Sequence, residues 1–344
     1  MSAPTITSED RPTTNPWVRL LNSERLVLWL TVAYFVVLVP FTPDLARPGN
    51  LTNLLITLLP LFVVAIGQTL VLITGGIDLS VTSIMALASV LAGMAMNDGN
   101  GWLAGSSLAA PVGVALMLGV GALIGGLNGL AVVALRMPPF IVTLTTMMFF
   151  SGLAIWLTHS KSIYGLPLAF NALGGNTLMA LSITAFVALL AHAFLSRSLW
   201  GRWLYAVGSN ARTARVSGVP AGSVTVSAYV VGGVFAAVGA ILYTGQAETA
   251  SPVLGQRLLL DIIAATVIGG TSLFGGRGRI VWTLFGVLFI KLLDNSLNLL
   301  NVSFFAITMI KGGVILLAAL IDSARIRIAT RIGNSPRLNR RLHD

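Results

Sequence analysis

The sequence predicts an all-α, polytopic integral membrane protein. Of its 344 residues, 56% are hydrophobic and only 9% are charged, whereas an average soluble domain carries about 25% charged residues. Apolar runs long enough to cross ~30 Å of hydrocarbon recur along the chain. The runs are continuous and do not alternate, which favours helices over the strands of a membrane barrel. This composition excludes an ordinary soluble enzyme, a disordered chain and a fibrous repeat.

The apolar runs predict about ten transmembrane helices. The first 25 residues are polar and lack the early apolar core of a signal peptide, so we expect a cytoplasmic N-terminal tail there. We expect a transmembrane domain over 26–321 and a basic cytoplasmic tail over 322–344, near the anionic membrane surface. The predicted spans are 26–41, 54–74, 81–96, 109–135, 140–158, 178–195, 224–244, 258–274, 280–300 and 303–321.

The distribution of Lys and Arg predicts the orientation of these spans. With ten spans and a cytoplasmic N-terminus, 16 of the 21 basic residues fall in cytoplasmic segments and 3 in outer loops. Such an excess is typical of cytoplasmic loops. It also accounts for the net charge of +10, so we expect no nucleic-acid partner.

Several kinds of chemistry are not expected. The chain has no cysteine and three scattered histidines, which argues against thiol catalysis and a metal centre. It has no Gly-x-x-x-x-Gly-Lys-Ser/Thr loop, so we expect no bound ATP and no enzymatic activity in this chain.

Five charged residues lie in or beside the apolar runs. Lys291 and Asp294 are three residues apart, share a helix face and can neutralise each other. Lys311 has three alternatives: it pairs with Asp261, pairs with Asp294, or extends to the lipid interface. Asp78 precedes the helix expected from Val81 and can cap its first turn.

Two glycine-broken segments interrupt the apolar sequence, at 73–80 and 268–278. Corresponding breaks in two halves are typical of translocation sites in proteins with internal repeats, and we expect two approximately repeated halves. Small residues in the fourth span, such as Gly121 and Gly125, predict close helix packing. The candidate residues of a translocation path are Asp78, Ser80, Asn128, Thr271, Ser272 and Asn298.

Several motifs resemble those of permease subunits of ABC importers for monosaccharides of the ribose, xylose and galactose type. They are TGGIDLSV at 74–81, GRWLYAVGSN at 201–210, ARVSGV at 214–219, VIGGTSLFGGRG at 267–278, LNLL at 297–300 and IKGGVILL at 310–317. The resemblance covers about residues 50–322. The chain differs from the usual pattern of the family at Thr82, Lys291 and Asp294.

The resemblance implies a pore subunit of the bacterial inner membrane that works with a second permease copy, identical or different. A periplasmic binding protein would deliver a sugar or polyol, and a cytoplasmic ATPase subunit would bind ATP and Mg. The loop 196–223 would contact that ATPase through a short helix near 211–219. Its candidate coupling residues are Arg202, Tyr205, Gly208, Asn210, Arg215, Ser217 and Gly218.

Two other functions remain open at this stage. A secondary transporter would use Asp78, Asp261 or Asp294 as a proton or sodium site. An intramembrane enzyme would need a nucleophile and base or a metal cluster within the spans, and the sequence places none there.

Overall fold

The computed structural model describes residues 26–333, and within this range the regular structure is helical. The predicted tail 1–25 and the final residues 334–344 lie outside the described part. The helices are α2 (Leu26–Leu38), η2 (Pro43–Ala46), α3 (Pro48–Ile73), α4 (Val81–Met96), α5 (Ala109–Ala134), α6 (Pro139–Thr158), α7 (Leu168–Gly175), α8 (Thr177–Arg197), α9 (Leu199–Ser209), α10 (Ala211–Val216), α11 (Ala221–Ala247), α12 (Leu259–Ile268), α13 (Ile280–Leu299) and α14 (Phe304–Gly333).

Each of the ten predicted spans corresponds to a helix. In the described residues, six helices are long and apolar enough to cross a membrane, and α2, α4, α12 and the first part of α14 are shorter apolar helices. The eighth span is wrong in extent, because α12 ends at Ile268 and Gly269 and Gly270 leave the helix. Helix α14 continues past 321 to Gly333. Helices α7 and α9 were not predicted from the sequence.

Helix α11 forms the centre of the bundle, and glycine allows its close contacts with α5 and α3. A Cβ added at Gly121 would lie 2.3 Å from the carbonyl oxygen of Gly233, and one added at Gly125 would lie 2.2 Å from the carbonyl oxygen of Tyr229. A Cβ at Gly67 of α3 would meet Gly232 and Phe235 of α11. The predicted role of these small residues in helix packing is confirmed.

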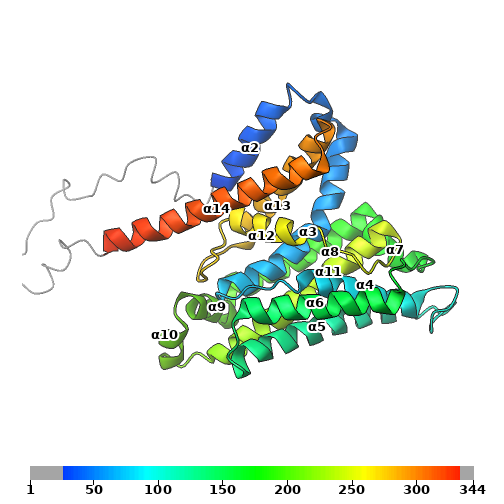
Figure 1. Cartoon of the computed structure of the whole chain (residues 1–344), viewed down its shortest axis with the longest axis horizontal. Coiled ribbons are helices and arrows are strands. Elements are labelled where there is room, and N and C mark those ends of the chain that lie inside the picture. The colour runs from blue at the N-terminus through cyan, green and yellow to red at the C-terminus, as the bar shows by residue number, and fades with distance from the viewer. Residues whose placement is uncertain (1–25, 334–344) are drawn as a thin grey trace, which may run out of the picture.

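One end of the bundle, which we call the α9 end, gathers α9, α10 and both glycine-broken segments. The amide of Gly276 donates a 2.8 Å hydrogen bond to the carbonyl of Ile73, which joins the two segments directly. Figure 1 shows α9 and α10 together at this end, beside the ends of α5 and α6.

The opposite end carries the connections between α4 and α5, between α6 and α7, and between α11 and α12. Ile163 and Ala250 form an antiparallel bridge, and the amide of Asp98 donates to the carbonyl of Gly165 at 2.9 Å. The chain therefore alternates between two ends, as expected of a multi-pass membrane protein.

The α12 segment departs from a simple crossing. Between α11 and α12 the chain is non-helical over 248–258. Ala250 packs against Gly93, near the end of α4, whereas Gly255 packs against Met85, near its start. Those α4 residues are eight positions apart, or about 12 Å along the helix. The connection therefore descends into the bundle before α12 begins (Figure 1).

Helices α2, α12, α13 and α14 form a second group beside the main bundle, and α3 bridges the two (Figure 1). The bridging helix α3 contains Pro60, which lacks the amide hydrogen of a regular helical hydrogen bond. Asn50 of α3 and Asn295 of α13 exchange amide hydrogen bonds of 2.8 and 2.9 Å. Tyr34 of α2 and Ser296 of α13 share a bond of 2.8 Å.

Candidate functional site

The α9–α10 segment is defined by two capping side chains. The Ser198 hydroxyl accepts a hydrogen bond from the Gly201 amide at 2.9 Å, which begins α9. Asn210 separates α9 from α10. Its side chain accepts a hydrogen bond from the Thr213 amide at 2.9 Å, which caps the start of α10. These bonds satisfy amides that lack partners at helix starts. The predicted short helix near 211–219 is observed as α10, and a second helix precedes it.

Most of the candidate coupling residues lie on the outer side of this segment. Val216 at the end of α10 is 85% exposed. Because α10 ends in an apolar, uncovered side chain and also carries Arg212 and Arg215, it offers a surface suited to another protein. Other exposed residues here include Arg202, Asn210, Arg212, Arg215, Ser217 and Gly218.

The two remaining coupling candidates, Tyr205 and Gly208, face inward and contact the glycine-broken segments. The Tyr205 hydroxyl donates to the carbonyl of Gly278 at 2.6 Å. A Cβ at Gly208 would lie 1.7 Å from the carbonyl oxygen of Ile73 and 2.6 Å from the amide of Gly276. Helix α9 therefore rests on the connections between α3 and α4 and between α12 and α13. Sequence order did not reveal this contact, because the partners are about 70 or more residues apart.

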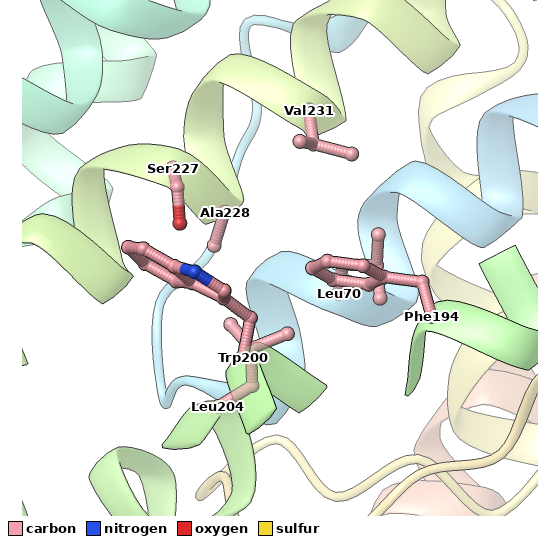
Figure 2. A pocket seen from close by; sticks show the side chains of 7 residues that line it. All are labelled: Leu70, Phe194, Trp200, Leu204, Ser227, Ala228 and Val231. Atoms are coloured by element: carbon pink, nitrogen blue, oxygen red, sulfur yellow. The ribbon is translucent and has the colours of Figure 1, made fainter. Parts of the chain in front are cut away.

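Trp200 attaches α9 to the membrane-spanning helices. It lines a cavity with Leu70 of α3, Phe194 of α8, and Ser227 and Ala228 of α11. Figure 2 shows the Trp200 ring beside Ser227 and Ala228, and the Phe194 ring beside Leu70. The lining is almost entirely apolar, so this cavity suits helix packing or an acyl chain rather than a hydroxylated solute.

The first glycine-broken segment is held by a buried polar network. One oxygen of Asp78 accepts from the Ser80 amide at 2.8 Å and from its hydroxyl at 2.6 Å. The Asn128 amide donates to the Ser80 hydroxyl at 2.7 Å. Asp78, Ser80 and Asn128 are each no more than 1% exposed. Tyr229 and Thr143 both donate to the carbonyl of Ile77, at 3.2 and 3.3 Å.

The structure brings five of the six path candidates to the α9 end. Thr271 and Ser272 are buried in the second glycine-broken segment, which contacts the first. Asn298 is separate from them. It is exposed near the end of α13, at the opposite end, and its amide donates to the carbonyl of Asp294 in its own helix at 2.7 Å.

We expect Ser80→Ala to destabilise the protein by about 1–3 kcal/mol, because it leaves the Asn128 amide buried without its acceptor. Asn298→Ala should change the free energy of unfolding by less than about 0.5 kcal/mol, because the site is exposed. Thermal unfolding of the purified variants measures both. Equal stability of Ser80→Ala and the parent would contradict the structural importance of the network.

A second polar cluster joins α12, α13 and α14. The Lys311 ammonium lies 2.9 Å from a carboxylate oxygen of Asp261 and 2.6 Å from one of Asp294. The expectation of a Lys291–Asp294 pair needs correction, since Asp294 pairs with Lys311. Lys291 forms no ion pair within 4 Å among the described side chains, although it interacts electrostatically with both carboxylates. The three alternatives for Lys311 resolve into simultaneous pairing with both acids.

Within residues 26–333, ten apolar helices, a buried polar network and an exposed basic helix at one end are the features of a polytopic membrane protein. The family model described as branched-chain amino acid transport system / permease component matches residues 50–320. The chain belongs to this family of permeases.

Named relatives agree with this assignment. The chain is 39% identical to the ribose import permease protein RbsC of Bacillus subtilis, over 81% of this chain and 86% of the relative. It is 34% identical to RbsC of Escherichia coli K12, over 91% and 96%. It is 32% identical to the autoinducer 2 import system permease protein LsrC of Enterobacter sp. 638, over 90% and 89%. No solved structure is significantly similar. The predicted class, a permease of an ABC importer, is confirmed.

Proposed function

We propose that this chain is the membrane subunit of an ATP-driven importer that carries a monosaccharide or related polyol across the bacterial inner membrane. The observation that carries the proposal is the contact of α9 with both glycine-broken segments. Relatives named as ribose import permeases support the solute class.

In this mechanism, the exposed face of α9 and α10 binds a cytoplasmic ATPase subunit, which holds ATP and Mg. Closure of the ATPase displaces α9. Because Gly208 touches the backbone of both glycine-broken segments, that displacement reaches the pairs α3–α4 and α12–α13 together. The buried network around Ser80 closes the α9 end until the displacement occurs.

The α9 end is cytoplasmic in this proposal, and both termini are on that side. The segment between α8 and α11 carries four arginines, Arg197, Arg202, Arg212 and Arg215, which favours a cytoplasmic position. A periplasmic binding protein then delivers the solute to the opposite end, and a second permease copy completes the pore.

Purification of the tagged chain in mild detergent, followed by mass identification of its partners, tests this assembly. We expect a P-loop ATPase in equal amount. Uptake of ribose into proteoliposomes should require ATP and persist with an uncoupler. Uptake that collapses with the uncoupler while ATP is constant would support a secondary transporter instead.

We expect Val216→Asp to weaken ATPase binding about tenfold or more, because a carboxylate would replace the apolar tip of α10 at the contact. The thermal stability of the isolated chain should not change, since Val216 is 85% exposed. The amount of ATPase that co-purifies measures the effect. Leu168→Asp is the matched control, because Leu168 is 86% exposed at the opposite end, and it should retain the ATPase.

A further inference from the structure

A groove lies between α8 and α11, with α3 beneath it. It is formed by two adjoining cavities of about 220 and 260 Å³ that share Leu70, Phe194 and Val231. The first cavity contains the Trp200 ring of α9 (Figure 2), and the second continues along α8 and α11. Leu70 is only 1% exposed, whereas Leu190, which also lines the groove, is 55% exposed. This groove, which we call the α8–α11 groove, is therefore open at the surface of the chain.

The α8–α11 groove has the depth of one membrane leaflet. Helices α3, α8 and α11 are each long and apolar enough to cross a membrane. Along α11 the lining runs from Ser227, beside Trp200, to Val238, which is eleven positions or about 16 Å. The hydrocarbon of a bilayer is about 30 Å thick, so each leaflet provides about half of that. An acyl chain that enters next to α9 would therefore extend along the whole groove.

The lining of the groove is apolar. Ser227 carries the one hydroxyl among its lining residues, and this hydroxyl donates to the carbonyl of Val224 at 2.8 Å. It therefore needs no partner from a ligand. A helix about 10 Å across would occupy on the order of 1,000 Å³ over the same length, which is several times the volume of either cavity. An extended hydrocarbon chain fits this space better than a helix of another protein, and the surrounding bilayer supplies such chains.

The groove ends near a basic side chain. Arg197 follows Phe194 by three residues and therefore lies on the same face of α8. It is exposed and forms no ion pair within residues 26–333. The stretch 177–247, from the start of α8 to the end of α11, contains no Asp or Glu. Arginine can bind phosphate through two parallel hydrogen bonds, and basic residues near the membrane surface attract anionic lipids. The charge at this end of the groove therefore complements a lipid phosphate.

We propose that the α8–α11 groove binds one acyl chain of an anionic phospholipid, whose phosphate contacts Arg197. Trp200 and Leu204 of α9 both line the groove, so the bound chain fills the space between α9 and the spans beneath it and supports the position of α9. Tryptophan is also the side chain most typical of the boundary between hydrocarbon and headgroups. The lipid site is independent of the solute and does not require transport.

Photocrosslinking of the full chain in vesicles tests the site. The vesicles consist of phosphatidylcholine with a small fraction of phosphatidylglycerol that carries a diazirine in one acyl chain, and peptide mass spectrometry locates the crosslinks. We expect peptides from 187–194 and 227–238 to be labelled about fivefold more than the α6 peptide with Met148 and Phe149, which are 68% and 66% exposed. The same diazirine on phosphatidylcholine should label the groove about fivefold less than the phosphatidylglycerol probe.

Two variants separate the acyl-chain contact from the headgroup contact. Val231→Phe places a ring in both cavities and should lower the labelling of 187–194, whereas Val112→Phe, at an exposed position of α5, should not. Arg197→Gln should reduce labelling by phosphatidylglycerol about fivefold, to the level of phosphatidylcholine, and Arg197→Lys should restore most of it. Arg136→Gln, an equal change of charge at an exposed position between α5 and α6, is its control. Because Arg197 is exposed, its substitution tests the site even if Val231→Phe does not fold.

Three results would overturn the proposal. Equal labelling of the groove and the α6 peptide would show ordinary contact with the bilayer. Equal labelling by both lipids, or parental labelling of Arg197→Gln, would show that the groove does not select an anionic headgroup. Absence of labelling would show that no lipid enters. In that last case, Leu190→Cys identifies a competing occupant, because the chain has no other cysteine, and a disulfide between two chains would place a second copy at the groove.

Discussion

Gly208→Ala is expected to reduce ATP-driven uptake per folded importer at least tenfold while ATP hydrolysis continues. The added Cβ would lie 1.7 Å from the carbonyl oxygen of Ile73 and 2.6 Å from the amide of Gly276. Backbone atoms cannot move aside as the end of a side chain can, so α9 must shift away from both glycine-broken segments. Overpacking of this kind costs about 1–3 kcal/mol of stability. Parallel measurement of ribose uptake and ATP hydrolysis in proteoliposomes gives the ratio that decides the prediction.

Two alanine variants separate uncoupling from general damage. A Cβ at Gly174 would lie 1.9 Å from the carbonyl oxygen of Leu242, at the opposite end. Gly174→Ala should therefore lower stability without changing the ratio of uptake to hydrolysis. A Cβ at Gly119 has nothing within 4 Å, so Gly119→Ala should be neutral. A parental ratio in Gly208→Ala would remove α9 as the coupling element.

Lys311→Met is expected to destabilise the membrane domain by about 3–5 kcal/mol. The substitution removes the cation that lies within 3 Å of both Asp261 and Asp294 and leaves two largely buried carboxylates near each other. Loss of one partner of a buried ion pair is costly because the remaining charge has no compensation. Thermal unfolding in detergent, together with the yield of folded protein from membranes, measures the loss.

Neutralising the partners as well should restore part of that loss. The triple variant Lys311→Met, Asp261→Asn, Asp294→Asn removes the two unpaired carboxylates, although the Lys291 ammonium remains in the cluster. Arg47→Met is the control for an exposed pair, since Arg47 and Asp44 lie 2.9 Å apart but are 73% and 50% exposed. It should cost less than about 1 kcal/mol. Equal effects of Lys311→Met and Arg47→Met would show that the cluster does not hold α14 in place.

Most of the fold could be predicted because the membrane imposes strong local rules. Each span must be about 20 apolar residues long, and its backbone must bond within itself. Helices such as α5 and α6 therefore match their predicted ranges to within one or two residues. The exception is α12: its apolar composition predicted a span over 258–274, but the helix ends at Ile268, where Gly269 and Gly270 leave it. Helix α9 was missed because it is short and amphipathic and lies beside a span.

The candidate site was predicted less completely, since contacts between distant residues depend on packing. Asp78, Ser80 and Asn128 were all candidates from the sequence. The structure shows that Asn128 bonds to Ser80 and adds Thr143 and Tyr229 as residues that hold this segment. Asn298 was grouped with these residues on an approximate repeat, yet it lies at the other end of the bundle.

The sequence by itself determined the class of the protein, its family, and the number and order of its spans. It also identified 196–223 as the segment that is exposed at the α9 end. Those properties follow from composition and local motifs, which act through hydrophobicity and the bonding of each helix with itself. Only the tertiary structure decided that α9 rests on both glycine-broken segments and that Lys311 pairs with two acids on two other helices. Residues 50 positions apart, such as Asp261 and Lys311, meet because helix packing aligns their depths in the bundle.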